Sequence, residues 1–142
     1  YSLSEVASDA DAALFAAREN GEQAVTSVAD GSVRTLLADV AARDEMAAGA
    51  DFAVRLVREA GGLVPLRPEP HRFAAFRVLR RAEAPAVLFE AGYLSNAADE
   101  AMLLDSVSRA RLVEALARGI EGEAARLSLS RRVALSPASS TE

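Results

Sequence analysis

The apolar residues in the first sixty positions of the chain recur at intervals of three and four residues, the spacing of amphipathic helices. A capping pattern opens the first helix at Ser8, and Gly21 ends it. A second apolar stripe covers residues 33–41, and a third follows Gly49. Because glycine weakens a helix interior, we predict a break at Gly49 and therefore three helices, the last ending at Gly61.

Two short apolar runs in the middle of the chain predict strands. Residues 73–79 alternate loosely between apolar and polar, and residues 86–89 form an apolar run that follows Pro85. A short apolar run bounded by proline and glycine is typical of a buried strand. The brief connection favours neighbouring positions for these two strands, and residues 1–4 are expected to belong to a further strand.

The last third of the chain is again helical in pattern. Asn96, with Asp99 three positions later, is an N-cap signal for a helix that runs to about Leu104. A longer helix is predicted over about residues 106–127, and the small, polar residues of 128–142 predict a disordered tail. Short strands between helices indicate an α/β fold with a central sheet flanked by helices.

The amino-acid composition and net charge argue against several classes of function. The net charge is −5, whereas a general nucleic-acid binder needs a basic face. No apolar run approaches the roughly 18 residues of a membrane span, and the first residues lack the pattern of a signal peptide. Cysteine is absent, so thiolate catalysis, disulfides and cysteine-based zinc sites are excluded for these 142 residues.

The most informative polar residue is Glu90, a carboxylate at the end of the predicted strand 86–89. Ligands of α/β proteins bind at the carboxyl ends of strands. Burial there would raise the pKa of the carboxyl and a neighbouring cation would lower it, which suits a group that transfers protons. A purely structural role, paired with Arg72 or Arg77, is the alternative.

The residues around Glu90 also carry a resemblance to a known family. Residues 85–96 read Pro-Ala-Val-Leu-Phe-Glu-Ala-Gly-Tyr-Leu-Ser-Asn, which resembles the signature of zinc-dependent N-acetylmuramoyl-L-alanine amidases of the amidase-3 kind. Residues 72–79 and 103–120 resemble the preceding strand and the closing helix of that family. Residues 1–20 resemble the segment after its third metal ligand. The resemblance covers roughly residues 1–127.

This resemblance implies a peptidoglycan hydrolase that cleaves the amide bond between N-acetylmuramic acid and L-alanine of the stem peptide. Its role would be cell-wall remodelling and daughter-cell separation, in the periplasm or outside the cell. Zinc would polarise the amide carbonyl and acidify a bound water. Glu90 would act as the general acid and base beside the metal.

The family's zinc ligands, a His, a Glu and a second His, precede the segment that matches residue 1. This chain has a single histidine, His71, which lies downstream, whereas a catalytic zinc needs about three protein ligands. We therefore interpret residues 1–127 as the carboxyl-terminal part of an amidase catalytic domain. Its α/β fold would be incomplete at the amino-terminal side, and the fragment alone is predicted to be inactive.

Other candidate residues have simpler interpretations. A hydrogen-bonded loop position is favoured over metal binding for His71, and structural pairing is at least as good for Arg72 as contact with a peptide carboxylate. Ser95 and Asn96 fit a helix start better than an active-site pair. With one histidine in the chain, a Ser-His-Asp hydrolase is disfavoured.

Residues of about 30–60 correspond to a place where some relatives insert a helix that plugs the zinc cleft with a carboxylate. Asp39 and Glu45 are the candidates here, with Gly31 and Gly49 as hinges, and the resemblance implies release by a LytM-type activator protein. The alternative function is a catalytically inactive amidase-like domain that binds cell-wall peptides or a divisome partner.

Overall fold

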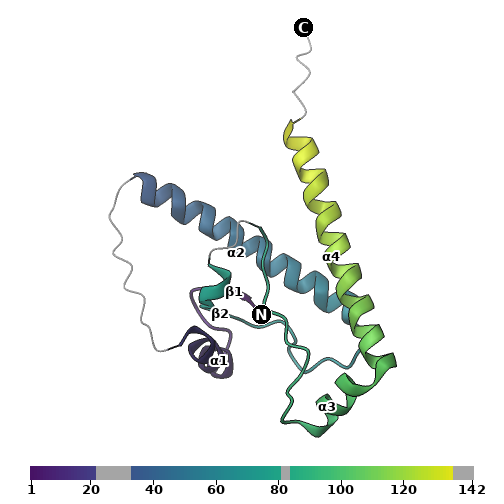
Figure 1. Cartoon of the computed structure of the whole chain (residues 1–142). Coiled ribbons are helices and arrows are strands. Elements are labelled where there is room, and N and C mark those ends of the chain that lie inside the picture. Colours follow the sequence, from purple (N-terminus) through teal and green to yellow (C-terminus); the bar gives the residue numbers. More distant parts are fainter. Residues whose placement is uncertain (22–32, 81–83, 136–142) are drawn as a thin grey trace.

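A computed structural model describes residues 1–21, 33–80 and 84–135, and this part of the chain is mostly helical (Figure 1). In chain order the elements are β1 (Ser2–Leu3), α1 (Ala10–Asn20), α2 (Val33–Ala60), β2 (Phe73–Ala74), the 3₁₀ helix η1 (Arg77–Leu79), α3 (Ala97–Leu104) and α4 (Ser106–Leu135). The two long helices, α2 and α4, pack against each other, and α3 leads into α4 (Figure 1). No helix among the described residues is long and apolar enough to cross a membrane.

Helix α1 begins one residue later than the capping pattern indicated. Asp9 is the N-cap, and its carboxylate accepts a hydrogen bond from the Ala12 amide at 2.9 Å. The predicted cap, Ser8, instead donates its hydroxyl to the Asp9 carboxylate. Gly21 ends the helix with a φ of 68°, a left-handed conformation that glycine adopts without strain, as predicted.

The predicted break at Gly49 is wrong, because α2 is continuous from Val33 to Ala60. A Cβ at Gly49 would lie 2.9 Å from the backbone oxygen of Ala86. The glycine therefore allows a second segment of backbone to approach the helix closely, and it does not interrupt the helix. The predicted hinge at Gly49 is thereby contradicted, and Gly31 lies outside the described residues. The helix ends before Gly61, as predicted.

The sheet is smaller than the predicted central sheet. Strands β1 and β2 pair in parallel, with Ser2 opposite Phe73 and Leu3 opposite Ala74. The predicted strand 73–79 therefore stops after two residues, and its end turns into η1. Within the described residues, this two-stranded sheet is what remains of the predicted central sheet.

The apolar run at residues 86–89 does not form a strand, and Phe89 is 44% exposed. Its backbone lies beside Tyr1: the Leu88 amide donates to the Tyr1 oxygen at 2.9 Å, and the Tyr1 nitrogen donates to the Leu88 oxygen at 2.7 Å. This contact is on the edge of β1 opposite β2, so β1 separates the two runs that were predicted to be neighbours. A strand needs a ladder of such bonds, and here one residue pair supplies them.

A small aromatic cluster forms the core between α1 and the sheet. The rings of Tyr1 and Phe15 stack at 5.1 Å, and Phe76 packs edge-on to Tyr1 at 5.2 Å. Phe76 is fully buried, together with Ala12 of α1. The cluster fixes the amino-terminal segment against β2 and, through Tyr1, against the backbone at Leu88.

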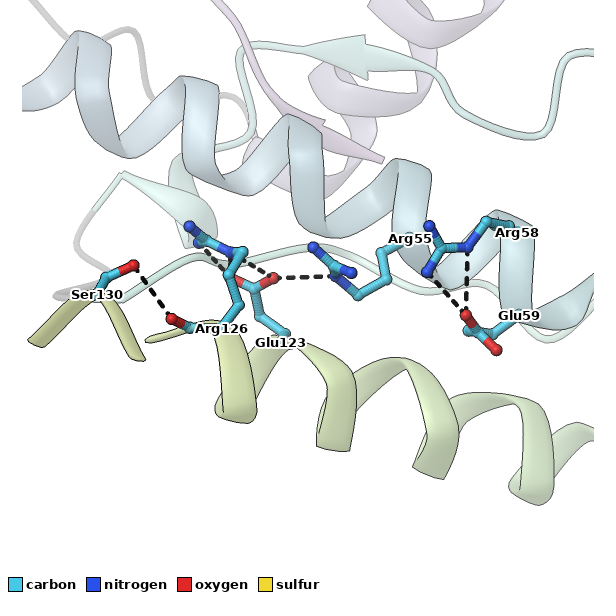
Figure 2. A network of polar contacts seen from close by, with 6 residues as sticks. All are labelled: Arg55, Arg58, Glu59, Glu123, Arg126 and Ser130. Atoms are coloured by element: carbon cyan, nitrogen blue, oxygen red, sulfur yellow. Dashed lines mark hydrogen bonds and ion pairs between the residues drawn. The ribbon is translucent and has the colours of Figure 1, made fainter. Parts of the chain in front are cut away.

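Helices α2 and α4 are joined by a buried ionic network (Figure 2). Glu123 of α4 is only 4% exposed and accepts hydrogen bonds from Arg55 of α2 at 3.3 Å and from Arg126 at 3.1 Å. The hydrogen bond from Arg126, aided by Arg55, lowers the pKa of Glu123, so its carboxylate stays charged. Because a buried charge needs partners, the network favours one alignment of the two helices.

Helix α4 extends to Leu135, so residues 128–135 of the predicted tail are helical. The serines in this segment lie within the helix, and their hydroxyls donate to carbonyls four residues earlier. Ser128 donates to the Ala124 oxygen at 2.8 Å, and Ser130 to the Arg126 oxygen at 3.1 Å. Residues 136–142, the rest of the predicted tail, lie outside the described part of the chain.

Candidate active site

A cavity of about 500 Å³ lies between α2, α4 and the two loops that flank β2 and η1. Its apolar wall comes from α2 and α4, including Leu56, Ala115 and Leu116. Its polar lining residues are Tyr1, Arg67, His71, Arg72, Glu90, Tyr93 and Asp99. The cavity thus brings the predicted catalytic carboxylate together with a loop that the sequence pattern marked only as a linker.

Glu90 is half-buried in this cavity. Burial raises the pKa of its carboxyl, and the charge of Glu19 adds to the rise, while the amino group of Tyr1 and, less strongly, Arg67 and the side chain of Tyr93 lower it in part. A carboxyl whose pKa is raised above its ordinary value returns a proton more readily than an ordinary glutamate, which suits a proton-transfer role.

The turn after Glu90 is held by the amino end of α3. Asn96 caps α3 by accepting from the Ala98 amide at 2.9 Å, and Asp99 accepts from the Tyr93 amide at 2.9 Å. Gly92 has a φ of 148°, which side-chain-bearing residues rarely adopt. A Cβ at this glycine would lie 3.0 Å from the Asp99 Cβ. The backbone from 90 to 93 is therefore fixed relative to α3, and the predicted helix start at Asn96 is confirmed.

His71 is a hydrogen-bonded loop residue, as its sequence context favoured. Its Nε2 lies 2.9 Å from the Ser2 hydroxyl, and burial lowers the pKa of the imidazole. The described residues contain no group of three or more His, Cys, Asp or Glu side chains that could hold a metal ion. His71 therefore has no partners here with which to form a zinc site.

Arg72 is engaged in structural ion pairs. Its guanidinium lies 2.9 Å from the Asp9 carboxylate and 3.7 Å from that of Asp11, which ties β2 to the start of α1. The side chain is largely buried, and its Nε has no hydrogen-bond partner in the described part of the chain. Structural pairing is confirmed for Arg72, and its observed partners are aspartates of the α1 amino end.

Two charged residues of the cavity were not identified as site residues from the sequence. Asp99 was recognised only as part of a helix-start signal, although its carboxylate also holds the Tyr93 amide. Arg67 lies in a proline-rich stretch with no periodicity, and its Nη1 donates to the Tyr93 hydroxyl at 3.3 Å. Only the fold brings Arg67 to the segment that carries Glu90.

Comparisons with known proteins point to one family. The profile of N-acetylmuramoyl-L-alanine amidases matches residues 9–122, most of the chain. The probable cell wall amidase LytH of Staphylococcus aureus is 44% identical over 46 residues, which is 32% of this chain and 16% of LytH. LytH of strain USA300 gives the same values. The match spans only about a sixth of these relatives, and no solved structure matches the chain.

Proposed function

This chain belongs to the N-acetylmuramoyl-L-alanine amidase family, and we propose that it is the carboxyl-terminal part of the catalytic domain of a zinc-dependent peptidoglycan hydrolase. The bond cleaved would be the amide between N-acetylmuramic acid and L-alanine of the stem peptide. Since peptidoglycan lies outside the cytoplasmic membrane, the site of action would be periplasmic or extracellular, with a role in wall remodelling and daughter-cell separation. The observation that carries this proposal is Glu90, half-buried in the cavity, within a segment that matches the family.

Glu90 would move the proton in this reaction. Its carboxylate would take a proton from the attacking water as the water oxygen bonds to the amide carbon. It would then return that proton to the nitrogen as the carbon–nitrogen bond breaks, which releases the amine of L-alanine and the lactyl carboxylic acid, whose remaining proton is lost to solvent or to the amine. The raised pKa of Glu90, which burial causes, favours the second step.

The described residues do not fit a zinc site by themselves, because they contain no group of three metal-binding side chains. We propose that the ligands lie upstream of residue 1, as the family resemblance implies. The metal would there supply Lewis-acid chemistry.

We expect residues 1–142 alone to bind no stoichiometric zinc and to release no stem peptide from sacculi. The full-length protein, with its upstream segment, is expected to do both. Metal content by atomic absorption and product analysis by mass spectrometry would measure this. Zinc-loaded turnover by residues 1–142 would contradict the proposed division of the site. A full-length protein that binds sacculi without cleaving them would favour the inactive, peptide-binding alternative.

We further propose that the amino-terminal half of α2 restrains the enzyme until a LytM-type activator binds. In support, residues 40–45 are exposed, and Val40 presents 55% of its surface to solvent. An exposed apolar residue on this helix offers a surface that another part of the full-length protein would cover in the restrained state. The side chains of Leu36, Leu37 and Asp39 lie outside the described residues, and Glu45 is exposed.

Replacing Leu36 and Leu37 with serine is expected to weaken this contact. The full-length variant should then digest sacculi without an activator, because a two-state latch needs only a few kcal/mol between its closed and open forms. Dye release from labelled sacculi and thermal unfolding would be measured together. If the variant misfolds, or stays as inactive as the parent, this half of α2 belongs to the core and control lies elsewhere.

A further inference from the structure

Arg67 lies on a loop that is stiffened by its own sequence. The loop joins α2 to β2 and contains Pro65, Pro68 and Pro70, each of which fixes φ near −65°. Arg67 and all three prolines line the cavity that contains Glu90. The fixed φ angles reduce the backbone entropy that the loop would lose when Arg67 binds a ligand.

The other basic groups of the cavity are already engaged, including the Tyr1 amino group, which donates to the Leu88 oxygen at 2.7 Å. Arg72 is paired with Asp9 at 2.9 Å, and His71, with its lowered pKa, contacts the Ser2 hydroxyl. Arg67 differs: within residues 1–21, 33–80 and 84–135 no carboxylate lies within ion-pair distance of its guanidinium. Its guanidinium instead donates a hydrogen bond to the neutral hydroxyl of Tyr93, at 3.3 Å. A guanidinium offers five donors, so most of them remain for a ligand.

The carboxylates of the cavity do not neutralise Arg67. Asp99 accepts the Tyr93 amide at 2.9 Å, which directs it to the backbone of the turn. Glu90 feels the charge of Arg67 without forming an ion pair with it. Arg67 thus lines the cavity that contains Glu90 without an ion-pair partner among the described residues.

We propose that Arg67 binds a carboxylate of the stem peptide and so positions the substrate amide against Glu90. This inference rests on the proposed function and adds a determinant of specificity to it. Guanidinium groups bind carboxylates through two parallel hydrogen bonds, which fix the orientation of the bound group as well as its position. Arg67 is exposed and donates to the Tyr93 hydroxyl, which also lines the cavity, and the cavity of about 500 Å³ has the size of small-ligand sites. From the sequence, Arg72 was the other candidate for such a contact, but its guanidinium is held in ion pairs with Asp9 and Asp11.

The test uses the full-length, zinc-loaded protein and two synthetic substrates. One is an N-acetylmuramoyl-L-alanyl peptide with a free carboxylate on the residue after alanine, and the other carries the amide of that carboxylate. We expect amidation to lower kcat/KM of the wild-type protein by about 10- to 100-fold, the range for loss of a charged hydrogen bond. Arg67→Gln should lose a similar factor with the acidic substrate and show no further loss with the amide.

Two further variants make the result specific. Arg67→Lys keeps the positive charge but loses the planar guanidinium that forms two parallel hydrogen bonds. It should therefore retain part of the preference for the acidic substrate over its amide. Arg58→Gln serves as the matched control, since Arg58 is an exposed arginine of α2 that does not line the cavity, and it should discriminate like the wild type. Thermal unfolding of each variant would show that the fold is intact.

The outcomes separate the two proposals. Equal cleavage of both substrates by the wild type, or unchanged discrimination in a folded Arg67→Gln variant, would overturn the role of Arg67 and leave the amidase function standing. Cleavage of neither substrate by the wild-type protein would overturn the proposed function and this inference with it.

Discussion

Replacing Glu90 with glutamine in the full-length protein is expected to lower turnover by about 10²- to 10⁴-fold, the usual contribution of a general acid or base. Glutamine keeps the shape of the side chain but cannot accept or return a proton. Because Glu90 is only half-buried and lines a cavity, the thermal midpoint should change little. Steady-state kinetics on a muramoyl-peptide substrate would measure turnover. Calorimetry and zinc analysis of the same sample would measure the thermal midpoint and the zinc content, which we expect to be retained.

The pH dependence gives an independent check of this role. Burial raises the pKa of Glu90, and below that pKa the carboxyl is protonated and cannot accept the proton of water. The kcat/KM of the wild type should therefore fall as the pH falls through that value, whereas Glu90→Gln should lack this limb. Glu100→Gln, an exposed position of α3 outside the cavity, is the control. Near-normal turnover of Glu90→Gln would show that Glu90 has a structural role. Loss of zinc from the variant would show that Glu90 is a metal ligand.

The helix ends that were predicted well are those set by local chemistry. Gly21, Gly61 and Asn96 end or begin helices through their own conformational preferences or hydrogen bonds, which the neighbouring sequence reveals. The errors involve distant partners. Gly49 looked like a helix break because nothing in the nearby sequence shows that the backbone of Ala86 approaches it.

Strands were harder to predict than helices for the same reason. The run at 86–89 has strand-like composition, but a strand exists only where a second backbone supplies a ladder of hydrogen bonds. Among the described residues, Tyr1 supplies one such pair, at Leu88. Sequence pattern thus located the segment that carries Glu90 but did not determine its secondary structure.

The same distinction between local and distant partners applies to the residues of the candidate site. Glu90 was predicted because its neighbours in sequence form a recognisable signature. Arg67 and Asp99 were missed. Arg67 lines the same cavity as Glu90 only because of the path of the loop after α2, and Asp99 accepts a hydrogen bond from a backbone amide six residues away. Side chains that act across a fold leave little periodic signal in the sequence.

The position of Glu90 depends on the turn that follows it, and Gly92→Ala is the substitution that tests this. Gly92 has a φ of 148°, and holding another residue in such a conformation costs about 1–3 kcal/mol. The new Cβ would also lie 3.0 Å from the Cβ of Asp99, an atom that cannot rotate away. Either α3 or the turn must shift, and the bond from the Tyr93 amide to Asp99 would weaken.

We expect full-length Gly92→Ala to unfold at a lower temperature and to lose turnover by about 10²-fold, since a displacement of about 1 Å can cost that much. Gly21→Ala is a matched control, because Gly21 also has a positive φ, 68°, but a Cβ there would meet nothing within 4 Å and the residue lies outside the cavity. It should lose stability by a similar backbone strain while its turnover per folded molecule stays near that of the wild type. If Gly92→Ala instead keeps full turnover when folded, α3 does not set the position of Glu90. Equal losses of turnover in both variants would show that the effect comes from stability alone.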